Sequence, residues 1–258
     1  MTLEARRLAI GYRDRDVGED IDVLLEPGAV TCLLGPNGSG KTTLLRTLLG
    51  LLPARRGDVK LDGVAISTLR DADRARRIAY VPQAADSFFD FTVRELVEMG
   101  RTAHGGLFGA PSRADRDAAQ HALERLGIAH LAERAVPRVS GGERQLALIA
   151  RALATEAPTL VMDEPTANLD FANQSRVLDE IARLGEAGRA VLFTTHHPDH
   201  ALRIAGDAIL LRAGRVLAAG PVDATLNSTN LSALYGRPVE VVEVRSADGA
   251  PAKVCVAR

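Results

Sequence analysis

The residues with the clearest chemical meaning lie near the start of the chain, where residues 35–42 read GPNGSGKT. Two glycines, then Lys41 and Thr42, have the spacing of a phosphate-binding loop. Glycine lets backbone N–H groups approach a phosphate closely, and the lysine ammonium neutralises phosphate charge. The pattern predicts a nucleotide site made by Gly35, Pro36, Asn37, Gly38, Ser39, Gly40, Lys41, Thr42 and Thr43.

The segments on either side of this loop have the structure that such a site needs. The apolar run at 29–34, AVTCLL, predicts a buried strand, and leucines recur at helical spacing over 44–49. A helix that begins at the loop directs its free N–H groups and the positive end of its dipole at one anion. Of the 32 basic residues only Lys41, Lys60 and Lys253 are lysines, so a compact ammonium at Lys41 stands out in an arginine-rich chain.

A pair of carboxylates, Asp163 and Glu164, follows the apolar run TLVM at 159–162. In open α/β sheets ligands bind at the carboxyl ends of the strands, where this pair would lie. Asp163 is predicted to hold Mg²⁺ through water, and Glu164 to polarise an attacking water. A strand that simply ends in acidic loop residues would look the same, but the phosphate loop earlier in the chain favours the metal-binding interpretation.

A second glycine-containing motif, SGGE, begins at Ser140. Serine followed by Glu143 before a helical apolar run is a capping box, and that interpretation is sufficient for the serine and the glutamate. It does not explain Gly141 and Gly142, because each glycine weakens a first helical turn by about 1 kcal/mol. Bare N–H groups beside a serine hydroxyl predict a second anion site, this one without a lysine.

Composition excludes several classes of protein. A chain of 258 residues is near the upper limit for one core, and a net charge of −1 gives no basic field for nucleic acid. Cys32 and Cys255 lie far apart and are expected to be reduced thiols. No apolar run is long enough to span a membrane, and the first residues lack the apolar stretch of a signal peptide. We therefore expect a cytoplasmic protein that reaches any membrane through a partner.

Element signals predict an α/β fold with an inserted helical part. Turn-bounded strands are expected at 8–10, 21–25, 59–61 and 78–81, and strands alternate with helices after Ser140, at 159–163, 190–195 and 208–211. Between them, Thr92 and Glu95 form a capping box, and a second helix is expected over about 112–126. We expect one domain over 1–258, with a helical subdomain at about 84–155. The segment 239–244 is β-like and carries no predicted chemistry.

These motifs, in this order, resemble the nucleotide-binding subunit of an ABC transporter over nearly the whole chain. The resemblance implies a P-loop NTPase (RecA-like) core with an N-terminal antiparallel β region, and hydrolysis of MgATP. It also implies a head-to-tail homodimer, in which the SGG signature of one subunit closes over ATP held by the P-loop of the other. The signature here departs from the commonest form, with Val139 first and Glu143 fifth.

The resemblance assigns further residues. Tyr12 matches the aromatic that stacks on adenine, although a strand tyrosine could equally be a core residue. Gln83 matches the glutamine that reaches Mg²⁺, beside Thr42 and Asp163, and residues 167–170 (ANLD) match the loop that crosses between subunits. His196 matches the histidine that contacts the γ-phosphate. The neighbouring His197 and His200 leave a metal cluster as the less favoured alternative.

Two local runs, FTVRELVEMGR at 91–101 and NLDFANQ at 168–174, resemble subunits that energise uptake of iron–siderophore, haem, cobalamin or, in some members, molybdate. The expected partners are integral membrane permease subunits and a separate substrate-binding protein. Phe88, Phe89 and Phe91 could anchor a permease helix or form a small helical core. A soluble ABC-type scaffold, as in iron–sulfur assembly, and an exporter remain alternatives. A chromosome or repair ATPase is disfavoured, because no heptads separate Lys41 from Asp163.

Overall fold

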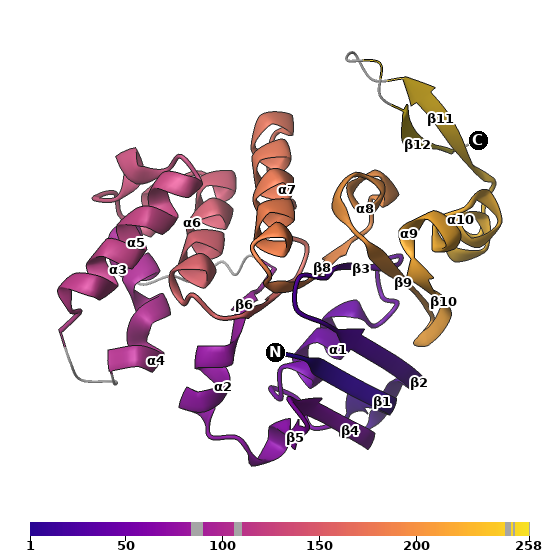
Figure 1. Ribbon diagram of the computed structural model, residues 1–258, viewed down its shortest axis with the longest axis horizontal. Helices are drawn as coiled ribbons and strands as arrows, with labels where there is room; N and C mark the ends of the chain where they lie inside the picture. The colour runs from indigo at the N-terminus through magenta and orange to yellow at the C-terminus, as the bar shows by residue number, and fades with distance from the viewer. Residues whose placement is uncertain (84–89, 106–109, 246–248, 250, 258) are drawn as a thin grey trace.

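The structure is a computed structural model that describes residues 1–83, 90–105, 110–245, 249 and 251–257 (Figure 1). Phe88 and Phe89 lie outside the described residues. No helix in the described ranges is both long enough and apolar enough to cross a bilayer.

The N-terminal part forms an antiparallel sheet with strand order β2-β1-β4-β5. Its strands are β1 (Leu3–Tyr12), β2 (Arg15–Leu25), β4 (Arg56–Leu61) and β5 (Val64–Ala65). Leu3 lies opposite both Leu25 and Leu61, so apolar residues of three strands share one face. That face packs on α1 (Lys41–Leu48), whereas charged residues occupy the other face. The predicted antiparallel region is confirmed, with strands longer than the sequence signals indicated.

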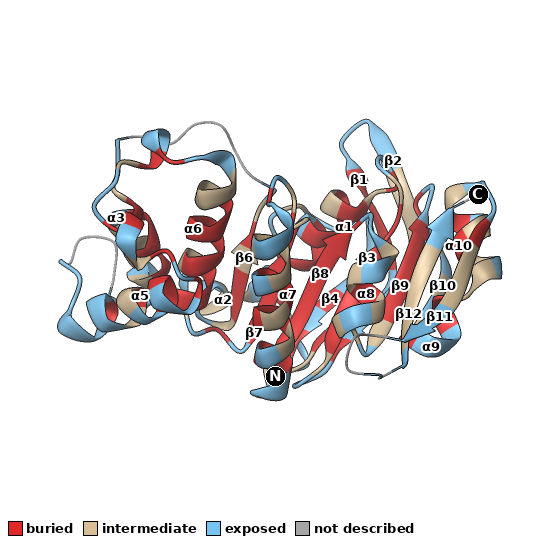
Figure 2. Cartoon of the chain, turned by 90° about the horizontal axis from the view of Figure 1, so that it is seen from above, coloured by how far each residue is buried: buried red, intermediate tan, exposed pale blue. Residues whose placement is uncertain are grey.

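The central sheet has the order β10-β9-β3-β8-β7-β6. Its strands are β3 (Val30–Leu34), β6 (Ile78–Val81), β7 (Thr159–Met162), β8 (Ala190–Thr195), β9 (Asp207–Arg212) and β10 (Arg215–Pro221). All neighbours pair in parallel except β9 with β10. Cys32 and Leu34 face one core and Leu33 the other, so β3 is buried on both faces. Figure 2 shows these inner strands in red, with exposed helix surface beside them.

Helices cover the sheet and extend to one side of it. Beside the sheet lie α2 (Asp71–Arg77), α7 (Phe171–Glu186), α8 (Pro198–Ile204), α9 (Val222–Thr225) and α10 (Ser228–Tyr235). On the left of Figure 1, α3 (Val93–Glu98) and α5 (Arg113–Arg125) pack against α6 (Gly141–Ala154), and α4 (Thr102–Gly105) lies against α2. The capping boxes at Thr92 and Ser140 are both present, and the helix expected over 112–126 begins after Ser112 with a third box. The α/β fold class is confirmed.

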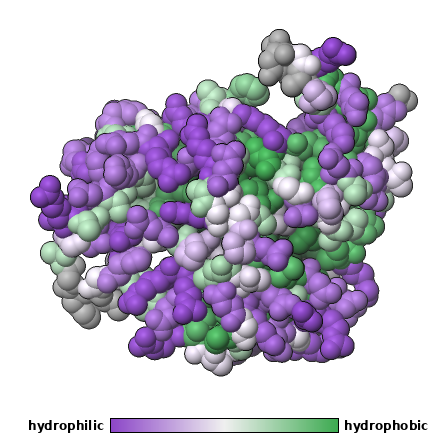
Figure 3. All heavy atoms as spheres, in the orientation of Figure 1, coloured by the Kyte–Doolittle hydropathy of each residue, from purple (hydrophilic) through white to green (hydrophobic). Residues whose placement is uncertain are grey.

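The chain continues into an antiparallel hairpin of β11 (Val239–Arg245) and β12 (Pro251–Ala257). The hairpin packs against α8 and α10 and extends beyond the sheet on the right of Figure 1. The β-like pattern at 239–244 therefore does form a strand. Its partner strand, β12, was not predicted from the sequence. On the face shown in Figure 3, hydrophobic residues gather toward these C-terminal elements, and hydrophilic residues dominate over the helical part.

Candidate nucleotide site

The phosphate loop connects β3 to α1 in a tight turn. A Cβ added at Gly35 would lie 2.3 Å from the Leu211 carbonyl oxygen, so no side chain fits at this position. Gly40, the N-cap of α1, has φ of 106° and makes no side-chain cap hydrogen bond. The first N–H groups of α1 are therefore left for a ligand to satisfy.

The Lys41 ammonium lies over this loop. Its Nζ donates hydrogen bonds to the carbonyl oxygens of Gly35 at 2.7 Å and Pro36 at 3.2 Å. The Lys41 side chain is only 6% exposed, and its Nζ is 3.7 Å from Glu164 Oε1. Burial lowers the pKa of Lys41, and the nearby carboxylates of Glu164 and Asp163 oppose that shift. The buried ammonium beside the uncapped N–H groups of α1 is suited to bind a polyanion, whereas the carboxylate is not a phosphate-binding group.

The two predicted carboxylates follow β7 directly. Asp163 is 1% exposed, and Glu164 has an uncommon positive φ of 48° for a residue with a side chain. The Thr194 hydroxyl holds both of them, because it accepts from the Glu164 N–H at 2.8 Å and donates to Asp163 Oδ1 at 2.8 Å. Thr194 therefore stabilises the strained turn that presents Glu164.

The predicted histidine meets this pair from the next strand. His196 follows β8, and its Nδ1 lies 3.4 Å from Glu164 Oε2. The Glu164 carboxylate thus has Lys41 at one oxygen and His196 at the other. His200 instead places its Nδ1 within 3.4 Å of the hydroxyls of Thr166 and Thr195, and burial lowers its pKa to about 4.

Two adjoining cavities share Glu164 and Gln83 in their walls. A cavity of about 520 Å³ is lined by the phosphate loop, and Tyr12 also lines it, with 44% of its surface exposed. This exposure agrees with a stacking role and argues against the core interpretation of Tyr12. A second cavity of about 300 Å³ is lined by His196, Asn168 and Ala167. The structure therefore brings the predicted residues of the loop, Asp163–Glu164, Gln83 and His196 to one place.

The SGG motif lies apart from these cavities. Ser140, Gly141 and Gly142 are absent from the described lining of both. Ser140 Oγ accepts from the Glu143 N–H at 3.2 Å, and the Glu143 carboxylate accepts from the Ser140 N–H at 2.8 Å. A Cβ at Gly142 would lie 3.2 Å from the Asn168 carbonyl oxygen, whereas one at Gly141 would meet no heavy atom within 4 Å. The capping box is real, and Gly141 leaves the helix start open.

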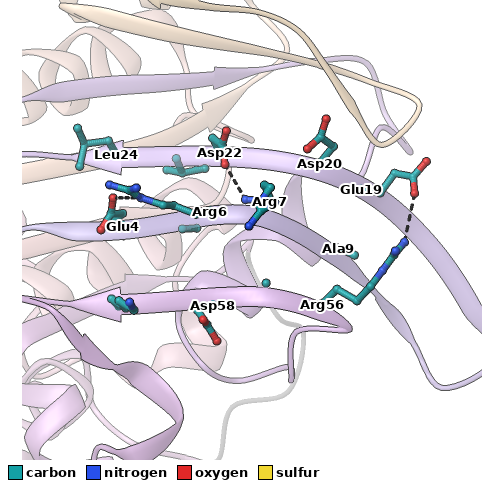
Figure 4. Close-up of a pocket in the computed structure, with 14 residues that line it drawn as sticks. Glu4, Arg6, Arg7, Ala9, Glu19, Asp20, Asp22, Leu24, Arg56 and Asp58 are labelled. Carbon is teal, nitrogen blue, oxygen red and sulfur yellow. Dashed lines mark hydrogen bonds and ion pairs between the residues drawn. The ribbon is translucent and has the colours of Figure 1, made fainter.

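A larger cavity, of about 1100 Å³, lies elsewhere, on the charged outer face of the N-terminal sheet (Figure 4). Two ion pairs lie in its lining, Arg6 with Glu4 and Arg56 with Glu19, and the Arg7 backbone N–H donates to Asp22 Oδ1 at 2.6 Å. Because its lining charges are of mixed sign and mostly exposed, we place the chemistry in the smaller cavity beside the phosphate loop.

Comparison with known proteins decides the family. The family model for ABC transporters matches residues 19–167 of this chain. The chain belongs to the ABC transporter family. As an ABC ATPase it binds ATP and hydrolyses it to drive transport, as its motifs predict. It is 43% identical over 242 residues to an uncharacterised ABC transporter ATP-binding protein of Haemophilus influenzae, covering 94% of this chain and 92% of that protein.

Two further similarities bear on the kind of transporter. The ABC ATPase is 37% identical to the iron(3+)-hydroxamate import ATP-binding protein FhuC of Bacillus subtilis, covering 93% of this chain and 90% of FhuC. A solved inward-facing structure assigned to a metal-chelate type ABC transporter superposes with a TM-score of 0.87 at 33% identity. That match covers 100% of this chain and 97% of the other.

The donor set of this ABC ATPase fits a magnesium ion. Asp163 Oδ2 is buried and has no hydrogen-bond partner among the described residues. A buried carboxylate oxygen with no donor is costly unless a cation or its bound water satisfies it. Ser39 Oγ, in the phosphate loop, is likewise buried and has no hydrogen-bond partner among the described residues.

Sequence reasoning missed Thr194 as part of the site. In the sequence, Thr194 has the pattern of an ordinary β-branched strand residue. Its contact with Asp163 joins residues 31 positions apart, and only the pairing of β7 with β8 brings them together.

Proposed function

We propose that this ABC ATPase powers import of a metal chelate, such as an iron–siderophore complex, haem or cobalamin. The similarity to FhuC and to the metal-chelate type transporter supports this cargo class. The local runs at 91–101 and 168–174, which resemble those of such subunits, agree with it.

One observation carries the proposed mechanism: the Glu164 carboxylate lies between Lys41 Nζ and His196 Nδ1 at the wall of the phosphate-loop cavity. Lys41 and the N–H groups of residues 38–43 bind the β- and γ-phosphates, and Tyr12 stacks on the adenine. Glu164 accepts a proton from the attacking water and orients it in line with the γ-phosphate. His196 donates a hydrogen bond to that phosphate.

The metal requirement follows from the same residues. Thr42, Asp163 and Gln83 would hold a magnesium ion, which would neutralise charge on the β- and γ-phosphates. The Thr194 hydroxyl donates to Asp163 Oδ1, and the buried Oδ2, which has no partner among the described residues, remains available to a cation.

The proposed assembly is a head-to-tail dimer. Ser140, Gly141 and Gly142 lie outside the cavity of their own chain, although Gly141 leaves the start of α6 open. A second copy would bring this start, and the loop 167–170, to the ATP held by the first. The dimer acts on permease subunits at the cytoplasmic face of the membrane. A separate substrate-binding protein delivers the cargo to these permease subunits. The single ATPase domain includes a helical subdomain over about 84–155, which faces the permease.

Uptake in cells tests this function. Strains carrying wild-type chain, Glu164→Gln or Lys60→Ala receive radiolabelled ferric hydroxamate, haem or cobalamin. Lys60 lies on the charged outer face of the N-terminal sheet, so Lys60→Ala is the matched control. We expect wild type and control to take up one of these cargoes and Glu164→Gln to lose that uptake. If uptake of all three is the same with and without the chain, the cargo class is wrong.

A further inference from the structure

Tyr235 makes a contact with the site that the mechanism above does not use. It is the last residue of α10, and its hydroxyl donates a hydrogen bond to the His196 carbonyl oxygen at 2.9 Å. Its ring packs half-buried against the main core. Burial raises the pKa of the Tyr235 phenol, so the hydroxyl keeps its proton and remains a donor.

The peptide group that Tyr235 contacts is held from a second side. The N–H of His197, in the same peptide, donates to Thr195 Oγ1 at 3.0 Å. The His196–His197 peptide thus has both its N–H and its carbonyl in hydrogen bonds, the first to the local Thr195 hydroxyl and the second to Tyr235 of α10. Fixing this peptide restricts the backbone that carries the imidazole.

This restriction matters because the imidazole is only partly covered. The His196 side chain is 44% exposed, its ring contacts that of His197 at a centroid distance of 4.1 Å, and its Nδ1 lies 3.4 Å from Glu164 Oε2. An exposed side chain keeps its orientation only if its backbone and its hydrogen-bond partner are both fixed. Thr194 fixes the backbone of Glu164, Lys41 pairs with its carboxylate, and the His196 backbone is fixed by Thr195 and Tyr235.

The C-terminal unit, defined as α10, β11 and β12, is in turn anchored to the segment after His196. The Cys255 N–H donates to Asp199 Oδ1 at 2.7 Å, which attaches β12 to the start of α8. Within the unit, Ser232 Oγ accepts from the Val239 N–H at 2.9 Å and so joins α10 to β11. The unit therefore contacts the His196 segment at His196 itself and three residues later.

We propose that Tyr235 is a positioning residue for ATP hydrolysis, and that through it the C-terminal unit holds His196 in register with Glu164. This inference rests on the proposed contact of His196 with the γ-phosphate. It gives the C-terminal unit a function in the reaction, although the unit supplies no atom to the phosphate site.

Steady-state ATPase kinetics of the full chain test the inference. Tyr235→Phe removes only the hydroxyl, and the matched control Ser232→Ala removes the two hydrogen bonds of the Ser232 hydroxyl with Val239, neither of which reaches His196. We expect Tyr235→Phe to lower kcat about two- to tenfold, the value of one hydrogen bond, with KM for ATP unchanged. Ser232→Ala should leave both constants unchanged, and thermal unfolding of both variants checks that they fold.

The His196→Ala background separates the inference about Tyr235 from the proposed role of His196. If Tyr235 acts through His196, adding Tyr235→Phe to His196→Ala should cause no further loss of kcat. A full additional loss, or an unchanged kcat in the single variant Tyr235→Phe, would overturn the inference while the role of His196 stands. Wild-type kcat in His196→Ala would instead show that the proposed role of His196 fails, and the inference fails with it.

Discussion

The molecule has two helix N-termini suited to bind phosphate. They differ in whether the chain itself supplies a side-chain cap for the first N–H groups of the helix. The start of α1 at Gly40 has no side-chain cap, and Lys41 lies beside it in a cavity of about 520 Å³. The start of α6 has its own side-chain cap, the Ser140–Glu143 capping box, and has no lysine. The first start needs a ligand to satisfy its N–H groups, whereas the second is stable without one. We infer that α1 binds ATP in the single chain and that α6 does so only across a dimer.

Glu164→Gln is expected to have the largest effect. The amide cannot accept the proton of the attacking water, so turnover should fall by about 10² to 10⁴ while ATP still binds at α1. If the α6 start completes the site, the ATP-bound dimer should accumulate in gel filtration with MgATP. A variant that remains monomeric yet hydrolyses ATP normally would contradict both the role of Glu164 and the dimer.

Lys41→Ala tests the α1 start alone. Loss of the ammonium should weaken ATP binding about 100-fold or more, because a buried charge-assisted contact to phosphate disappears. Isothermal titration with ATP measures the loss, and Lys60→Ala serves as the control. Unchanged affinity in Lys41→Ala would remove the basis for ascribing ATP binding to this loop.

Ser140→Ala tests the claim that α6 is complete by itself. Removing the N-cap hydroxyl should lower the free energy of unfolding by about 1 kcal/mol in urea, without nucleotide present. ATP affinity of the single chain should not change. A stability loss that appears only with ATP would mean that the cap and the ligand are not separate, and the contrast between the two starts would be lost.

Substitution of the two glycines at the start of α6 should have the smallest effects on stability, and the two effects should have opposite signs or differ clearly in size. Gly141→Ala meets no heavy atom within 4 Å, so it should leave stability unchanged or raise it by at most about 1 kcal/mol. Gly142→Ala must displace the Asn168 carbonyl oxygen at 3.2 Å and should destabilise the chain. Urea unfolding of both variants makes the comparison, and equal shifts would show that loop 167–170 does not constrain Gly142.

Local signals predicted a large part of the fold and the site. The strand, glycine loop and helix around Lys41, and the capping boxes at Thr92 and Ser140, depend on contacts between residues a few positions apart. Such contacts are encoded by spacing alone, and so are the apolar runs that became β3, β7 and β8. From these residues the sequence determined the family, the α/β class and the candidate carboxylates.

Only the tertiary structure decided which distant residues meet. Thr194 holds Asp163 and Glu164 because β8 pairs with β7, and Tyr235 reaches His196 over 39 residues because α10 packs against β9 and β10. Many strand orders would bury the same apolar runs, so the local pattern does not fix the order of the strands. Packing of the whole chain sets the strand order and the docking of the helices. The sequence therefore determined which groups could do the chemistry, and packing decided which neighbours hold them in place.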